Sequence, residues 1–277
     1  VDSQNILWVG TMYNGGLYRY NRSSLTFRVY RKHFKPQHTT VNDDHINDIC
    51  EDINSDLWLS TRSEGLNRYV RKTGRFQFFH HTPGDSENLS SDKTGALETD
   101  QQGNIWIASR SGMLDVYNIH SQRFKHLKAD PDSPNTLNSS KISYIHLGRN
   151  GMLWIGTSDY GLSCLHPGTN QWTHYTAETH LPSNCIHGIL EDDTGGLWIS
   201  TPHNIIWLNP RNDKVHTFDK SDGLITNNWY PGACFKNDPR HRALTGRRRQ
   251  RAAFARALWG RPPVAAPWVD ASTPASQ

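Results

Sequence analysis

The sequence predicts an all-β fold, a partial β-propeller built from four-stranded antiparallel blades. Three observations lead to this prediction. A motif centred on tryptophan recurs five times, short segments of alternating apolar and polar residues flank each copy, and turns rich in Gly, Asn and Asp separate these segments. A repeat of about 40–50 residues with four strands is typical of a propeller blade. We therefore expect about five and a half blades that pack face to face, because a single blade cannot bury both of its faces.

The repeat is clearest in the strand that carries the tryptophan. The five copies read LWVGT, LWLST, IWIAS, LWIGT and LWIST, and their tryptophans are Trp8, Trp58, Trp106, Trp154 and Trp198. Before each of the last four copies, a short apolar segment ends in acidic or polar residues and a turn follows. Asn, Asp and Gly accept positive φ, so these turns predict a tight hairpin between a first strand and the tryptophan strand.

Two further strands are expected in each repeat. Third strands are predicted at segments such as LYRY from Leu17 and LNRY from Leu66, and fourth strands at segments such as FRVY from Phe27 and FQFF from Phe76. The first copy begins at its second strand, and a sixth copy starts at residues 229–238 without continuing. We interpret the chain as a fragment of a larger ring.

Composition divides the chain into a propeller, residues 1–238, and a basic tail, residues 239–277. The propeller holds 22 Lys and Arg against 25 Asp and Glu, whereas the tail holds eight Arg and one Asp. The net charge of −3 on the propeller gives no electrostatic footprint for nucleic acid. No apolar stretch approaches the ~18–20 residues that span a bilayer, so no membrane contact by this segment is expected. The tail is expected to be irregular or short-helical, disordered or out of frame.

No catalytic residues, metal site or cofactor are predicted. The four cysteines form no C-x-x-C pair, and no clustered His or Cys completes a metal-ligand pattern. The segment DINSD, residues 52–56, lacks the glycine of a calcium loop and is expected to be a hairpin turn. Three of the fifteen histidines, His126, His174 and His216, are expected at solvent-facing positions of fourth strands.

The candidate ligand-binding surface follows from propeller geometry. The loops that join the second strand to the third, and the fourth strand to the next blade, meet on one face around the central channel. The first set of loops carries polar and aromatic side chains suited to carbohydrate or anion recognition. These candidate residues are Tyr13, Asn14, Arg62, Glu64, Arg110, Asp159, Tyr160 and His203.

The units resemble the two-component regulator propeller repeat, whose pattern includes LWIGT followed by Gly-Gly-Leu and Asn-Arg-Tyr. LWVGT with GGLYRY (residues 15–20) and LWLST with EGLNRY (residues 64–69) match it closely, and the resemblance covers residues 1–238. It implies the periplasmic or extracytoplasmic sensor of an inner-membrane regulator that acts in signal transduction through a phosphorelay. The implied partners are a small-molecule or oligosaccharide ligand and an output domain in the parent chain, a histidine kinase or a diguanylate cyclase. A homodimer with two arrangements would transmit the signal.

Two other functions remain open, a carbohydrate-active propeller hydrolase or lyase and a protein-binding scaffold. The Asp-box of sialidase-type propellers is not matched, because the acid stands too far from the glycine in DQQGNIW, residues 100–106. A tryptophan–aspartate repeat would end its third strand in Trp-Asp, whereas the tryptophan here lies on the second strand. Residues 244–258 resemble an ABC-transporter ATPase signature, but Arg247 replaces its second glycine and no phosphate-binding loop accompanies it, so ATPase activity is not expected.

Overall fold

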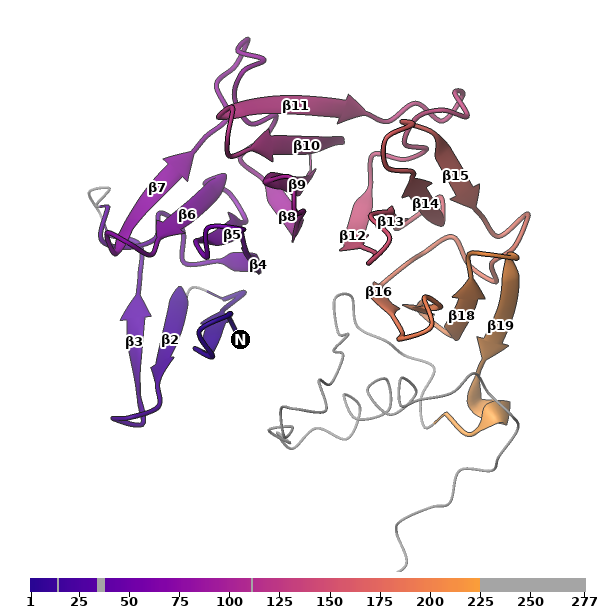
Figure 1. Ribbon diagram of the computed structural model, residues 1–277, viewed down its shortest axis with the longest axis horizontal. Helices are drawn as coiled ribbons and strands as arrows, with labels where there is room; N and C mark the ends of the chain where they lie inside the picture. Colours follow the sequence, from indigo (N-terminus) through magenta and orange to yellow (C-terminus); the bar gives the residue numbers. More distant parts are fainter. Residues whose placement is uncertain (14, 34–37, 111, 225–277) are drawn as a thin grey trace, which may run out of the picture.

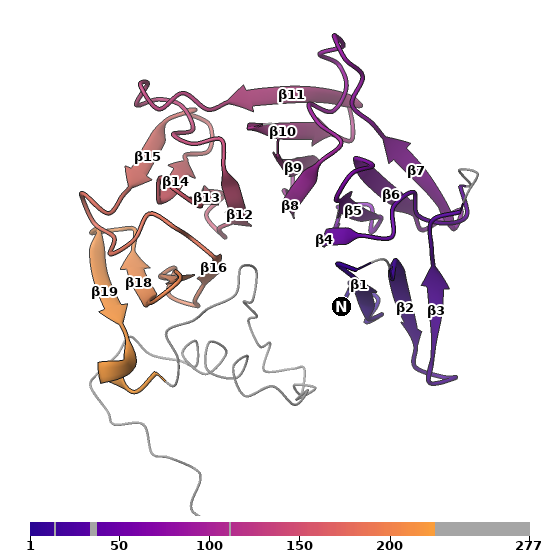
Figure 2. The same ribbon diagram turned by 180° about the vertical axis from the view of Figure 1, so that it is seen from behind.

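The structure is a computed structural model that describes residues 1–13, 15–33, 38–110 and 112–224. Within these residues, nineteen strands form five antiparallel sheets, four with four strands and one with three. The sheets follow one another in chain order as an arc around a common centre, and Figure 2 shows the same arc from behind (Figures 1 and 2). The predicted partial propeller is therefore confirmed.

We number the sheets as blades 1 to 5 and give the strands of each in chain order. Blade 1 contains β1 (Trp8–Gly10), β2 (Leu17–Asn21) and β3 (Thr26–Tyr30). Blade 2 contains β4 (Ile46–Glu51), β5 (Leu57–Thr61), β6 (Leu66–Val70) and β7 (Arg75–Phe79). Blade 3 contains β8 (Thr94–Thr99), β9 (Asn104–Ser109), β10 (Met113–Asn118) and β11 (Arg123–Lys128). Blade 4 contains β12 (Ile142–Leu147), β13 (Leu153–Thr157), β14 (Leu162–Leu165) and β15 (Trp172–Tyr175). Blade 5 contains β16 (Gly188–Glu191), β17 (Leu197–Ser200), β18 (Ile205–Asn209) and β19 (Lys214–Phe218), and the 3-10 helix η1 (Lys220–Asp222) follows it.

The first-to-second-strand hairpins form where the turn residues predicted them. In each repeat the residue three positions before the tryptophan adopts a left-handed conformation, with φ between 61° and 85°. Residues without a bulky side chain accept this conformation at low cost. The five residues are Asn5, Ser55, Gly103, Gly151 and Gly195. The segment at residues 52–56 is thus a hairpin turn, as expected.

The tryptophans fill the space between neighbouring blades. The Trp58 ring is fully buried and lies 5.1 Å from the ring of Phe79 and 5.3 Å from that of Tyr117, which belongs to blade 3. Trp8 contacts Tyr69 of blade 2 in the same way, at 5.4 Å between ring centroids. Trp154 shares a buried cluster with residues of blade 5. Aromatic area between sheets therefore holds the arc together.

The innermost strands β4, β8, β12 and β16 lie side by side around the centre of the arc (Figure 1). In the part of the chain that the structure describes, no helix has the length and apolar character needed to cross a membrane. The start of a sixth copy at residues 229–238, the expected tail at residues 239–277 and the ATPase-like segment at residues 244–258 all lie outside the described residues.

Candidate ligand-binding face

Antiparallel pairing sends the connections of each blade alternately to the two ends of its strands. The loops between second and third strands therefore share one end with the connectors between blades, and we call this end the loop face. Every described candidate residue lies on it, while Asn14 lies outside the described residues. The candidates follow the second strands of the five blades in turn: Tyr13; Arg62 and Glu64; Arg110; Asp159 and Tyr160; and His203.

Hydrogen bonds fix these loops to the connector that leads into the next blade. The Gly65 N–H donates to the Asp92 carbonyl at 2.8 Å, and the Gly161 N–H donates to the Asn184 carbonyl at 2.8 Å. Gly65 has φ of 70°, and a β-carbon there would overlap the Phe79 carbonyl oxygen. The glycine thus permits the loop backbone to lie close to the Phe79 carbonyl, which fixes the loop and the positions of its side chains.

Blades 1 to 3 contribute a cationic and aromatic region to the loop face. Tyr13 is 89 % exposed, and its ring centroid lies 6.3 Å from that of His45, which is buried. Burial lowers the pKa of His45, and the nearby guanidinium groups of Arg62 and Arg110 lower it further, against the opposing effect of Asp43. Two arginines from different blades therefore act on one imidazole ring.

Two of the candidate acids are already paired with lysines. Glu64 accepts an ion pair from Lys32 at 2.8 Å, and Asp159 accepts one from Lys141 at 2.9 Å. Burial acts to raise the pKa of Asp159, but hydrogen bonds from Ser139 and Lys141 lower it overall. Both carboxylates are therefore neutralised by lysine side chains of the protein.

The last two candidates, Tyr160 and His203, are exposed on blades 4 and 5. The backbone N–H groups of Tyr160 and His203 donate to the hydroxyls of Thr157 and Thr201, at 2.9 Å and 3.4 Å. Both positions are thus turn residues with outward side chains, as expected for loops of this face.

The expectation that the fourth-strand histidines are solvent-facing is wrong for His126 and His174. The Nδ1 atom of His126 lies 2.6 Å from a carboxylate oxygen of Asp115, which is fully buried, and Nε2 lies 2.9 Å from the Ser86 carbonyl oxygen. At the equivalent place in blade 4, His174 contacts the hydroxyl of Ser163 at 3.0 Å. Both rings are half-buried because each lies between a side chain of its own third strand and a carbonyl of the connector before its blade, at Ser86 and Pro134.

Half-buried acids also lie on the innermost strands at the centre of the arc. Asp48 on β4 accepts a hydrogen bond from the Leu97 N–H of β8 at 2.9 Å, and Glu98 on β8 accepts one from the Leu147 N–H of β12 at 3.4 Å. Burial raises the pKa of Asp48 and raises that of Glu98 to about 7. A perturbed carboxyl can mark a functional site. Here each carboxyl links one innermost strand to the next, which gives it a structural partner.

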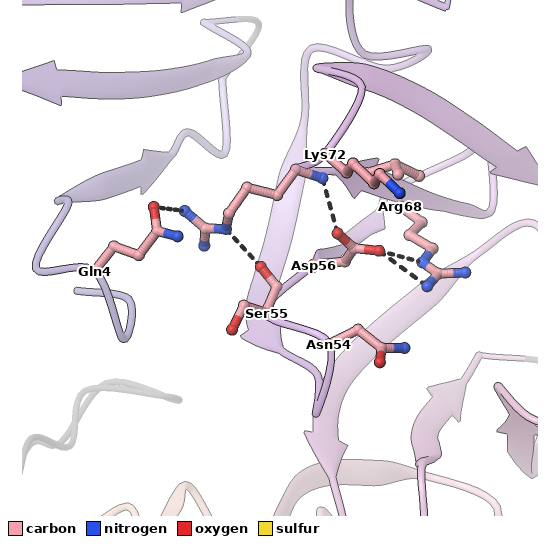
Figure 3. Close-up of a pocket in the computed structure, with 8 residues that line it drawn as sticks. Gln4, Asn54, Ser55, Asp56, Arg68 and Lys72 are labelled. Carbon is pink, nitrogen blue, oxygen red and sulfur yellow. Dashed lines mark hydrogen bonds and ion pairs between the residues drawn. The ribbon is translucent and has the colours of Figure 1, made fainter.

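The opposite end of the blades carries a pocket of about 600 Å³ between blades 1 and 2 (Figure 3). Its lining residues come from the turns before β1, between β4 and β5, and after β6, and from strand β6 itself. Two arginines dominate it, but Arg68 is paired with Asp56 and Arg71 with Asp2, each at 2.9 Å. The charges of both arginines are therefore neutralised by the protein itself, whereas the exposed Lys72 at the edge of the pocket has no ion pair among the described residues.

Sequence reasoning missed several residues of these sites. Asp43 on the connector before β4 accepts hydrogen bonds from the Ser63 N–H and hydroxyl, at 3.1 and 2.9 Å, and so anchors the loop that carries Arg62. His45 and Lys93 stand one residue before the innermost strands, and no motif marks that position. Within the described residues, no group of three His, Cys, Asp or Glu is arranged to hold a metal ion.

One segment of the chain matches a known family of propeller repeats. The sequence profile described as "Two component regulator propeller" matches residues 180–203, which include the blade 4 to blade 5 connector and the tryptophan strand of blade 5. The chain is thus a β-propeller with a match to the two-component regulator propeller repeat at these residues, as the resemblance of its units indicated. No curated protein matches the chain at a significant level.

Solved structures show the same fold at low sequence identity. The extracellular domain of a protein described as a hybrid two component system, from B. thetaiotaomicron, is 22 % identical with a TM-score of 0.66, over 78 % of this chain and 28 % of that one. A second extracellular domain from B. thetaiotaomicron, described as part of a one component system, is 21 % identical with a TM-score of 0.65, over 79 % and 30 %. Virginiamycin B lyase from Staphylococcus aureus is 13 % identical with a TM-score of 0.60, over 79 % and 68 %. The chain thus spans less than a third of the length of each of the two extracellular domains.

Proposed function

We propose that this chain is the ligand-sensing propeller part of a bacterial two-component-type signal transduction protein. The match of the two-component regulator propeller repeat at residues 180–203 carries this proposal. The fold it shares with extracellular domains of signalling proteins supports an extracytoplasmic position. The output domain, a histidine kinase or a diguanylate cyclase, would lie elsewhere in the parent chain.

The ligand in this proposal is a small molecule or oligosaccharide that binds on the loop face. The loops of blades 1, 2 and 4 are tied to the connector of the next blade by a backbone hydrogen bond, as at Gly65 and Asp92. A ligand that bridges loops of different blades would therefore favour one arrangement of neighbouring blades over another. In a homodimer, a differential affinity of this kind shifts the population toward the signalling state.

An enzymatic propeller is the second candidate function, favoured by the fold that the chain shares with virginiamycin B lyase. The Ser90, Asp115 and His126 side chains form a chain of hydrogen bonds, but the buried aspartate stands between the other two. A nucleophile needs the base beside it, so this order does not activate the serine. The two candidate acids of the loop face, Glu64 and Asp159, are likewise already paired with lysines.

Binding without turnover is the test of the proposal. The purified chain is titrated with a panel of oligosaccharides by isothermal calorimetry, and the same mixtures are analysed by mass spectrometry after prolonged incubation. The sensor predicts saturable heat with at least one glycan and an unchanged glycan mass. A shortened or unsaturated glycan would contradict the sensing function and show that the chain is a hydrolase or a lyase.

A further inference from the structure

Two positions recur on the loop face and bring their residues together in pairs. One is the residue just before the innermost strand, and the other is the residue just after the second strand. In blades 2 and 3 the residue after the second strand donates its backbone N–H to the carbonyl oxygen of the residue before the innermost strand. Arg62 donates to His45 at 3.2 Å, and Arg110 donates to Lys93 at 2.8 Å. Ser158 and Lys141 repeat the contact in blade 4, at 3.0 Å. The side chains of each pair therefore start from adjacent points at the mouth of the central channel.

These positions hold cations in blades 2 to 4, and three of the cations are not neutralised. Lys141 is paired with Asp159. Among the described residues, Arg62, Lys93 and Arg110 form no ion pair, and all three side chains are exposed. We call these three residues the cationic rim. It is a local excess of positive charge on a propeller whose net charge is −3 over residues 1–238.

The cationic rim acts as one electrostatic patch and adjoins an aromatic ring. Arg62 and Arg110, from neighbouring blades, both perturb the imidazole of His45. The Tyr13 ring stands beside that imidazole and is almost wholly exposed. Exposed guanidinium groups bind carboxylates and sulfates through two parallel hydrogen bonds. An exposed aromatic face offers the flat apolar surface against which a sugar ring packs.

We propose that the cationic rim, together with Tyr13, binds an anionic oligosaccharide, one that carries carboxylate or sulfate groups. The inference rests on the proposed sensing function and names the ligand class of its loop face. Arg62 and Arg110 bind the acidic groups of the ligand. Lys93, beside Arg110, supplies a third positive charge, and Tyr13 packs on a sugar ring. The anion also gains because it neutralises like charges that repel one another when the face is empty.

The experiment titrates the 277-residue chain with three probes of equal length by isothermal calorimetry: oligogalacturonate, a chondroitin sulfate oligosaccharide and a neutral cello-oligosaccharide. We expect one anionic probe to bind at least about tenfold more tightly than the neutral one, since hydrogen bonds between charged groups contribute that much. The carboxylate and sulfate arms identify the acidic group. The affinity should fall as sodium chloride rises, because salt screens exposed charges.

Substitutions connect the affinity to the rim. Arg62→Gln and Arg110→Gln should each weaken anionic binding about tenfold, while the thermal midpoint stays unchanged because neither side chain has an ion-pair partner. Arg123→Gln is the matched control, since Arg123 is an exposed arginine at the turn that opens β11, on the opposite end of the blade. It should leave the affinity unaltered.

The outcomes separate this inference from the proposed function. Tight binding of the neutral probe that is insensitive to Arg62→Gln overturns the cationic rim and leaves the sensor intact. Binding of no oligosaccharide at all overturns both. A single-stranded oligonucleotide of equal charge that binds as tightly as the best anionic sugar also overturns the inference, because it would show a nonspecific response to charge.

Discussion

At the scale of single residues, a hydrogen bond links the hairpin turn to its tryptophan in four of the five blades, and in blade 2 this bond is buried. Asp52 accepts the Trp58 Nε1–H at 2.8 Å, and the same carboxylate accepts the N–H groups of Asn54 and Asp56 that define the turn. The bond recurs at Asp2, Asp100 and Asp192, whereas Gly148 stands at this place in blade 4. One carboxylate therefore sets both the turn and the orientation of the indole that packs between blades.

Asp52→Ala should lower the free energy of unfolding by about 3 kcal/mol, because it leaves the fully buried Trp58 indole N–H and two turn N–H groups without an acceptor. Asn54→Ala is the control in the same turn, with an exposed side chain and an expected change below about 0.5 kcal/mol. Urea titrations followed by tryptophan fluorescence measure both. Equal effects of the two substitutions would refute the role given to Asp52.

His126 and His174 occupy equivalent places but should respond to pH with opposite signs. Burial acts to lower the pKa of His126, yet its hydrogen bonds to Asp115 and the Ser86 carbonyl raise it overall. Its contribution is fully present below the unfolded pKa, about 6.5, and is lost as the pH rises through the higher folded pKa. Burial lowers the pKa of His174, so its contribution is present above about pH 6.5 and is lost as the pH falls through the lower folded pKa.

We therefore expect His126→Gln to destabilise the protein more at pH 5.5 than at pH 8.5, and His174→Gln to do the reverse (pH values chosen about one unit or more either side of 6.5). The measurement is the free energy of unfolding in urea for the wild type and each variant at both pH values. Two variants with the same direction of pH dependence would contradict the assigned hydrogen bonds.

At the scale of elements, neighbouring blades approach closely where small residues permit it. A β-carbon at Gly156 on β13 would lie 2.6 Å from a methyl group of Ile186, the residue that leads into blade 5. Gly10 faces Ile46 in the same way, at 2.7 Å. The equivalent positions in blade 2 and at the start of blade 3 hold Ser60 and the smaller Thr94. In these three blades, glycine thus goes with isoleucine and serine with the smaller threonine.

Gly156→Ser should destabilise the protein by about 1–3 kcal/mol, because the added atoms overlap Ile186. In the Ile186→Thr background, which recreates the Ser60–Thr94 combination, the same change should cost at least about 1 kcal/mol less. A double-mutant cycle on the free energy of unfolding gives the coupling. Additive effects would show that the two side chains do not share this space.

Most of the fold could be predicted because its signals are local. Alternation with a period of two, the tryptophan motif and turn residues such as Gly103 act within a few positions of the strands they define. The loop face was also predictable, since strand order alone places Arg62 and Arg110 at one end. The backbone hydrogen bond between Arg110 and Lys93 could not be predicted, because it depends on how a connector folds back onto a loop. An acid six residues before four of the five tryptophans was a visible signal for the hydrogen bond of Asp52.

At the scale of the whole molecule, the arc exposes an apolar face at blade 1. Val9, Phe27 and Val29 are 39 %, 50 % and 44 % exposed, whereas Leu59 and Phe76, which correspond to the first two in blade 2, are fully buried against blade 1. Strand β1 also pairs with only one neighbour, β2, among the described strands. Such a face has the composition of an interface between blades.

The purified chain should consequently self-associate through blade 1 at micromolar concentration. Phe27→Lys should shift it toward the monomer in sedimentation velocity, because a charge cannot be buried there without a partner. Ile53→Lys, at an isolated exposed position in the turn of blade 2, is the control and should leave the distribution unchanged. Identical profiles for wild type and Phe27→Lys would mean that association uses another surface.

Hydrogen–deuterium exchange on the chain with and without the best-binding oligosaccharide shows whether the loop face receives the ligand. A ligand bound there should slow exchange in the loops at residues 61–65 and 109–110 and in the connector at residues 43–45. Exchange that slows instead at the turns of residues 52–56 and 70–74, on the side of the pocket in Figure 3, would contradict binding at the loop face.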